Sequence, residues 1–236
     1  MKTKKTFRVF LTAVFVLVTM AMNAQTTIYV YQKDKTTDAY DISNLDSISF
    51  TPPVVAVDIT DTYLKNTTVY VDGGFATVGD AIGTNNRYFL ASDWLVNDAV
   101  AAVGDVDGSL ANRLGFVAGT GWSAAVDAVV DGHIYQTINL PAGNYRFDAY
   151  VYDTASSPLD GYVVAQVGGD DLPSIDAIKN GTATASVAPI LEAVPADVRI
   201  SVPFTLSSAG PVSVGFVANN PGYTRIFFSS VKLWQL

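Results

Sequence analysis

Apolar and polar residues alternate along several short stretches of this chain. The clearest stretch runs from Val198 to Leu206, where every second residue is apolar and the residues between them are polar or proline. A period of two places successive side chains on opposite faces of a strand, so this stretch predicts a half-buried strand. Pro203 lies on its polar face and cannot donate a hydrogen bond to a neighbouring strand, which favours an edge position or a bulge.

The same alternation predicts strands at Tyr145–Val151 and Pro211–Ala218, and we expect Ser207–Gly210 to form a hairpin turn before the second of them. Less regular runs predict five more strands, at Thr68–Val71, Arg113–Val117, His133–Leu140, Gly161–Val167 and Arg225–Trp234. Many short strands separated by turn residues are typical of a two-sheet sandwich. We therefore expect residues 54–236 to form one all-β domain.

Helical patterns are few in this domain. Pro173–Asn180 predicts a short helix closed by Gly181, and Trp122–Val130 has a weaker helical spacing of apolar residues. Residues 181–196 are rich in small side chains, so we expect a long loop there. We therefore expect this domain to consist mainly of strands and loops.

Residues 25–53 are predicted to be a separate hairpin and linker. Thr27–Gln32 and Ala39–Ile42 fit two strands around a polar turn. A two-stranded hairpin is marginally stable alone in water, so we expect it to dock on the main domain or on a partner. Pro52 and Pro53 then form a stiff linker.

Residues 1–24 have the features of an export signal. A basic head precedes the apolar run Val9–Met22, and Ala24 is a small residue before a predicted cut at Gln25. A helix of that run would span about 21 Å, short of the roughly 30 Å hydrocarbon core of a bilayer. No later segment is long and apolar enough to cross a membrane. We expect the mature protein in the periplasm, at the cell surface or outside the cell.

Composition excludes several kinds of site. The 236-residue chain has no cysteine and one histidine, His133, which excludes disulfides, thiolate sites and multi-histidine metal centres. Glu192 is the one glutamate among 22 acidic residues, and this preference for aspartate favours turns over helices. Without residues 1–24 the chain has 10 basic and 22 acidic residues, a formal charge of −12 that repels nucleic acid and anionic membranes.

Three segments together resemble known proteins. Residues 133–147, with Leu140-Pro-Ala-Gly143 between two strands, are similar to a signature of galactose-binding-like jelly-roll domains. Residues 225–234 resemble the closing strand of that fold, and residues 28–50 resemble the N-terminal hairpin of many secreted proteins of gut Bacteroidetes. The resemblance implies an uncharacterised secreted domain family of those bacteria, with a two-sheet jelly-roll sandwich and a small N-terminal β-hairpin.

The same resemblance implies neighbours and modifications. Members of such families often lie beside glycan-acquisition or adhesion modules. Asp46-Ser47-Ile48 and Asp153-Thr154-Ala155 match the short O-glycosylation signal of these bacteria. Galactose-binding-like domains often hold one structural calcium ion. The neighbouring modules imply that the partner is a glycan or an envelope protein. The fold itself does not imply a partner, because fold alone does not confer function.

A calcium loop has one candidate in the sequence. Residues 105–109 supply Asp105, Asp107 and Ser109, but an EF-hand requires Gly at its sixth and Glu at its twelfth position, which this segment lacks. A polar turn is the alternative interpretation. Other carboxylates that could bind calcium are Asp58, Asp61, Asp170 and Asp171. The identity of any metal ligand stays open.

Catalysis has little support in the sequence. A glycoside hydrolase needs two carboxyl groups at about 5–9 Å, and no motif singles out such a pair. A serine hydrolase would need His133, which follows the turn residues Asp131-Gly132 and is predicted to be an ordinary surface histidine. A nucleophile elbow of the Gly-x-Ser-x-Gly kind is absent from the sequence. We therefore expect a non-enzymatic protein, with a hydrolase as a minor alternative.

Aromatic residues near irregular segments are the remaining signal of binding. Asn219–Arg225 is a turn-rich segment in which Tyr223 offers a stacking face and Asn220 and Arg225 offer hydrogen bonds. Trp94 and Trp122 could lie at the same end of a sandwich, although Trp is more often a core residue. The sequence thus favours a glycan-binding β-sandwich. The alternative is a structural or adhesion protein of the envelope that makes protein–protein contacts.

Overall fold

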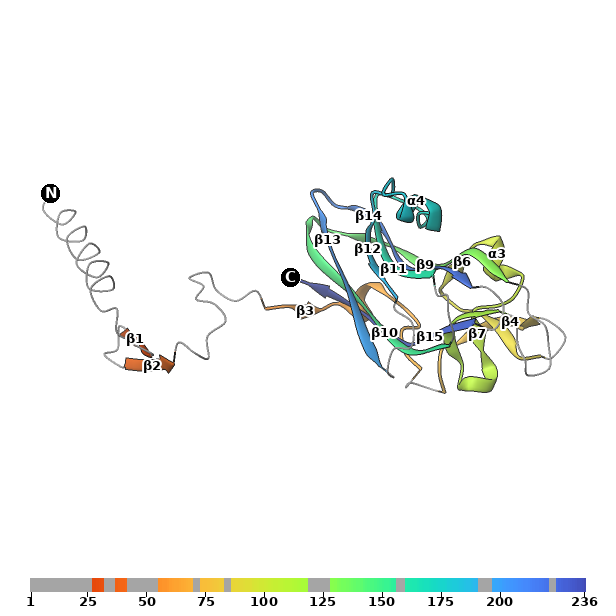
Figure 1. The fold of residues 1–236 in the computed structure, drawn as a ribbon, viewed down its shortest axis with the longest axis horizontal. Helices are drawn as coiled ribbons and strands as arrows, with labels where there is room; N and C mark the ends of the chain where they lie inside the picture. The colour runs from red at the N-terminus through yellow and green to blue at the C-terminus, as the bar shows by residue number, and fades with distance from the viewer. Residues whose placement is uncertain are drawn as a thin grey trace, which may run out of the picture. The chain divides into compact units, whose positions relative to one another are not determined.

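The computed structural model describes residues 27–31, 37–41, 55–69, 73–82, 86–118, 128–155, 160–190, 197–220 and 224–236. The chain divides into two compact units, residues 1–53 and 54–236. In the first unit β1 (Thr27–Tyr31) pairs antiparallel with β2 (Thr37–Asp41), which confirms the predicted hairpin (Figure 1). The expected export signal, the cut at Gln25 and Ser47 lie outside the described residues.

The second unit is a two-sheet jelly-roll sandwich, as expected (Figure 1). Its large sheet contains, in spatial order, β13 (Val198–Leu206), β10 (Gly143–Ala155), β15 (Thr224–Gln235), β8 (Arg113–Ala118), β7 (Val106–Asp107), β5 (Tyr88–Ala91) and β4 (Thr77–Ile82). The short strand β3 (Val57–Asp58) also pairs with β15. The small sheet contains β12 (Ser186–Pro189), β11 (Asp160–Val167), β14 (Gly210–Asn220), β9 (Val129–Leu140) and β6 (Leu95–Val96).

From β8 onward the chain crosses between the sheets at almost every strand. Strands β8, β10, β13 and β15 belong to the large sheet, whereas β9, β11, β12 and β14 belong to the small one. Ser207–Gly210 therefore leads from one sheet to the other, and the prediction of a hairpin turn there is wrong. Of the two possibilities that Pro203 favoured, an edge position or a bulge, β13 takes the edge position, because among the described strands it pairs only with β10.

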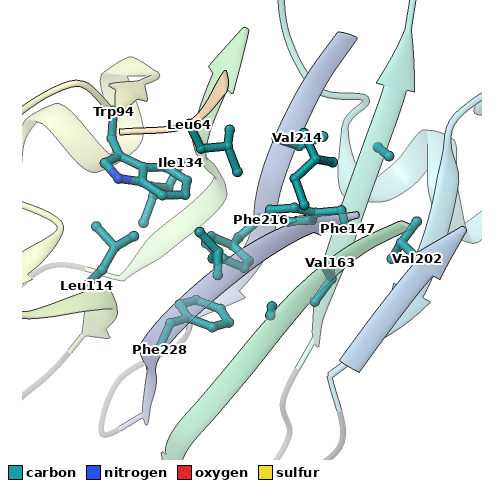
Figure 2. Close-up of a cluster of buried hydrophobic side chains, with 14 of the residues drawn as sticks. Leu64, Trp94, Leu114, Ile134, Phe147, Val163, Val202, Val214, Phe216 and Phe228 are labelled. Atoms are coloured by element: carbon teal, nitrogen blue, oxygen red, sulfur yellow. The ribbon is translucent and has the colours of Figure 1, made fainter. Parts of the chain in front are cut away.

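The core lies between the two sheets (Figure 2). Phe216 of the small sheet stacks on Phe228 of the large sheet, with ring centroids 3.6 Å apart. Phe147 packs against the same Phe216 ring at 6.2 Å. The face assignment of β13 is confirmed, since its apolar residues Val202 and Phe204 are buried. Burial of these side chains is the main favourable term that holds the two sheets together.

The outer side of the small sheet is covered by α4 (Ile175–Lys179), which confirms the predicted short helix (Figure 1). Ser174 caps it by accepting a hydrogen bond from the Ala177 amide at 3.2 Å. The predicted loop at 181–196 is wrong in part, since it contains β12. Of the weakly predicted helix at 122–130, residues 129 and 130 lie in β9 and residues 122–127 lie outside the described residues.

Short elements complete the second unit. They are α2 (Thr60–Tyr63), α3 (Asp98–Ala101) and the 3-10 helix η2 (Gly108–Leu110). The strand predicted at Thr68–Val71 is reduced to one bridge between Thr68 and Ser230, with residues 70 and 71 outside the described part. In the described ranges, no helix combines the length and the apolar character that crossing a bilayer requires.

Candidate functional site

The three described residues that were predicted to bind a ligand, Trp94, Asn220 and Arg225, do not form one surface. Trp94 is 6% exposed, and its indole stacks on Phe216 in the core (Figure 2). Asn220 is fully buried at the end of β14, whereas Arg225 is exposed on β15. This burial argues against Trp94 and Asn220 as ligand contacts. Trp122 and Tyr223 lie outside the described residues.

His133 is buried, so the expectation of a surface histidine is wrong. Its ring is 5% exposed on β9, and Nδ1 lies 2.9 Å from Oδ1 of Asp171, within hydrogen-bond distance. Nε2 lies 3.6 Å from Oδ1 of Asp131. Asp171 precedes α4, and Asp131 accepts a hydrogen bond from the Ile175 amide at 2.7 Å. The cluster therefore attaches the α4 segment to the small sheet.

The candidate calcium loop is a structural turn. Arg87 donates to both carboxylate oxygens of Asp107, at 2.9 and 2.7 Å, and Ser109 donates to the same carboxylate. Asp105 is 2% exposed and accepts a hydrogen bond from the Ala91 amide at 2.7 Å. Burial raises the pKa of Asp105 to about 7, which weakens it as a cation ligand. Within the described ranges, no three or more His, Cys, Asp or Glu residues are grouped to hold a metal ion.

A polar and aromatic surface lies on the outer side of the large sheet, where β13, β10 and β15 run side by side (Figure 1). Arg146 on β10 is in register with Pro203 on β13 and with Trp234 on β15. In the next row, Asp148 is in register with Lys232. These residues alternate with core residues, so their side chains point away from the core. We call this surface the Trp234 face, defined by Asn144, Arg146, Asp148, Pro203, Thr205, Lys232 and Trp234.

Two cations flank the indole of Trp234. The guanidinium of Arg146 lies 5.3 Å from the ring centroid, and Nζ of Lys232 lies 5.4 Å from it. Both distances are within the range of cation–π attraction. The indole is half-buried, and its Nε1 atom is buried without a hydrogen-bond partner among the described residues. The ring is therefore positioned by the two cations beside it.

Carboxylates fix both cations. Arg146 Nε donates to Asp148 Oδ1 at 2.9 Å, and Asp148 is fully buried. Lys232 donates to Asp58 Oδ2 at 3.2 Å. Burial alone would raise the pKa of Asp58, but hydrogen bonds from Thr60 and Lys232 outweigh it and hold the pKa below its ordinary value. Asp58 is thus an anion that helps to orient Lys232.

An open hollow of about 640 Å³ adjoins this surface. It is lined by Ala56, Asn144, Tyr145, Arg146, Ser186, Pro203, Phe204, Thr205 and Leu236. Thr205 donates to the amide oxygen of Asn144 at 2.8 Å, which orients that amide. The volume is within the roughly 300–1,000 Å³ of small-molecule sites. Amide, hydroxyl and guanidinium groups beside an indole are suited to bind hydroxylated ligands.

Sequence reasoning missed the Trp234 face because its members are far apart in the chain. Arg146 and Trp234 are 88 positions apart and carry no shared motif. One signal was available: Arg146 occupies the polar face of a strand that the alternation predicted, and Trp234 ends a strand predicted from a less regular run. An arginine and a tryptophan at such positions pointed to a polar sheet surface with an aromatic ring.

Comparison with known proteins identifies the family of the chain. A family model described as "Domain of unknown function (DUF5013)" matches residues 75–215, more than half of the sequence, and the chain belongs to this family. The match includes Arg146 and ends before Trp234. Among curated proteins, none matches the chain.

Several solved structures are similar to the chain at low identity. One is TmCBM61 in complex with β-1,4-galactotriose, with 13% identity, a TM-score of 0.36, and coverage of 67% of this chain and 100% of that one. A second is the K3 adhesin domain of Lys-gingipain from Porphyromonas gingivalis w83, with 15% identity, a TM-score of 0.41, and coverage of 68% and 99%.

A third is a candidate sugar-binding protein from Bacteroides thetaiotaomicron VPI-5482, with 13% identity, a TM-score of 0.40, and coverage of 72% and 97%. At these identities and scores the likeness to the three structures says nothing about the ligand of this chain. Any function must therefore be argued from its own residues.

Proposed function

We propose that this member of the DUF5013 family is an exported, non-enzymatic module that binds a glycan on the Trp234 face. The observation that carries the proposal is the position of Arg146. Its guanidinium lies beside the Trp234 indole, and Arg146 also lines the hollow with Asn144 and Thr205. Sugars present apolar C–H faces and hydroxyl groups, and this surface offers an aromatic ring and hydrogen-bonding groups for both.

The non-enzymatic part of the proposal rests on the position of the chain's one imidazole. His133 is buried on the small sheet beside Asp171, whereas the Trp234 face belongs to the large sheet. A rigid, half-buried ring on a sheet favours binding, because little conformational freedom is lost when a ligand contacts it.

A glycan array followed by calorimetry on the mature protein tests this proposal. We expect weak binding, with a dissociation constant between about 1 µM and 1 mM. Trp234→Ala is expected to weaken it at least tenfold, and Asn144→Ala less. Lys65→Gln, an exposed residue outside the site, is the matched control and should leave binding unchanged. A glycan that binds Trp234→Ala as tightly as the wild type would place the site elsewhere.

One observation favours the second candidate function, a structural or adhesion role through protein contacts. β4 is an edge strand whose residues 77–80 are all exposed, and Val78 is 54% exposed. An exposed edge strand can pair with a strand of another protein. Replacement of Val78 by Pro should abolish such an assembly, as measured by light scattering or cross-linking, while glycan binding persists.

A further inference from the structure

We propose that the glycan bound by the Trp234 face is acidic and carries carboxylate or sulfate groups. This inference rests on the proposed function and names the ligand class of the same site. It begins from the distribution of charge. The chain has an excess of acidic residues, yet its cations are gathered on the large sheet. Of the eight basic residues in the described ranges, six lie in this sheet or directly before one of its strands: Arg87, Arg113, Arg146, Arg199, Arg225 and Lys232.

The two remaining basic residues belong to other parts of the unit and are paired with acids. Lys65 lies 3.8 Å from Asp93, and Lys179 donates to Asp160 at 2.9 Å. Counted in the same way, seven acidic residues belong to this sheet, so it is close to neutral, whereas the rest of the second unit has two basic and eight acidic residues among those described. The large sheet therefore repels an anionic ligand less than the remaining surface of this unit does.

The carboxylates near the Trp234 face are already engaged. Asp148 accepts from Arg146 through Oδ1, and Asp58 accepts from Lys232 through Oδ2. Arg199, by contrast, is exposed on β13 in register with Tyr150, and no carboxylate partner is found for it among the described residues. The surface thus has more cations than it needs for its own anions.

Arg146 is the group that would recognise the anion. Only its Nε is used by Asp148, and within the described part of the chain its two terminal nitrogens make no hydrogen bond. Arg146 also lines the hollow. A planar guanidinium binds a carboxylate or sulfate through two parallel hydrogen bonds, which a lysine cannot do. Because buried Asp148 holds the group in place, little freedom is lost on binding.

The test uses two matched pairs of polysaccharides. Polygalacturonate is compared with its fully methyl-esterified form, and dextran sulfate with dextran, so that each pair shares one backbone and differs in its anion. We expect the mature protein to bind at least one acidic member tenfold or more tightly than its neutral form. Binding should weaken as salt is raised, because ions screen exposed charges. The member that binds distinguishes a carboxylate ligand from a sulfate ligand.

Variants then locate the effect. Arg146→Gln and Arg199→Gln should each weaken acidic binding at least threefold, Arg146→Lys should be intermediate, and Lys179→Gln is the control. Arg199 is exposed, so its variant tests the proposal even if Arg146→Gln, which leaves Asp148 unpaired, fails to fold. Equal affinity for both members of each pair, with loss in Trp234→Ala, would overturn the inference and leave the proposed function standing. If neither these polysaccharides nor any glycan on the array binds, both fall.

Discussion

Trp94 stacks on Phe216, with ring centroids 5.8 Å apart and ring planes inclined by 17° (Figure 2). The indole Nε1 of Trp94 donates to the carbonyl oxygen of Asn66 at 2.8 Å. Its apolar surface and its single donor are thus both used within the core. Trp94 and Trp234 therefore have different roles, although both are tryptophans in or beside strands.

Replacement of Trp94 by Ala should destabilise the second unit strongly. It removes a buried ring that contacts Phe216 and Phe75, so we expect a loss of about 3–5 kcal/mol in the free energy of unfolding. Trp234→Ala is the matched control and should cost less, because Trp234 is half-buried on an outer face. Urea unfolding followed by circular dichroism measures both values, and equal losses would contradict the assignment.

Asp105 should make stability depend on pH. Its pKa is about 7 in the folded chain and near 3.8 when the chain is unfolded, so the folded state holds the proton more tightly. The stabilisation is complete below the unfolded value and is lost as pH rises through about 7. The free energy of unfolding should therefore fall by on the order of 4 kcal/mol as the pH rises from the unfolded pKa of 3.8 to the folded pKa of about 7.

Asp105→Asn provides the control for this effect, because an amide does not titrate. We expect the free energy of unfolding of the wild type to fall relative to that of Asp105→Asn between about pH 5 and pH 8. Urea titrations at several pH values measure both curves. Parallel curves would show that Asp105 is not protonated in the folded chain.

Gly215 marks a close approach of two strands. A Cβ atom added there would overlap the carbonyl oxygen of Ile134 and lie 2.6 Å from the Cα of Tyr135. We expect Gly215→Ala to cost more than about 2 kcal/mol, since β14 and β9 would have to separate. Gly210 is in the same strand and has nothing within 4 Å of such an atom, so Gly210→Ala should change thermal stability little. Similar melting temperatures would show that β14 can shift freely.

Export is a prediction that mass spectrometry can check. If residues 1–24 are removed, the protein recovered outside the cytoplasm should begin at or near Gln25. A protein that keeps Met1 after export would contradict the signal peptide. Lengthening the apolar run Val9–Met22 by about six leucines is a useful comparison, because it should convert a cleaved signal into a membrane anchor.

The sequence predicted best those strands that have one face in the core and one in solvent. β13 and β10 alternate cleanly because one face of each strand is buried in the core and the other belongs to the outer face of the large sheet. β14 is buried on both faces, since α4 covers its outer side. Its sequence therefore alternates clearly only over Val212–Phe216. β5, β6 and β7 were missed because two to four residues are too few for a period to appear.

Neither the strand pairing nor the candidate site could be predicted from the sequence, because local composition does not determine which strands become neighbours. The turn at Ser207–Gly210 has the composition of a hairpin, but its flanking strands enter different sheets because their apolar faces are buried from opposite sides. Local composition cannot distinguish these two outcomes. The sequence suggested Trp94 as a ligand contact because it lies beside irregular segments. Its stacking on Phe216 depends on the position of β14, which the sequence alone does not give.

The position of β15 has a consequence for how the protein is made. It follows every other described strand in the sequence, yet it lies between β10 and β8 in the large sheet. Until β15 has emerged from the ribosome, β10 and β8 have no common neighbour and Phe228 is missing from the core. The large sheet therefore stays incomplete until the last strand of the chain has been made. Contacts of such long sequence separation also form slowly, and a chain that ended before β15 would lack Trp234 and the core residues Phe228 and Leu233.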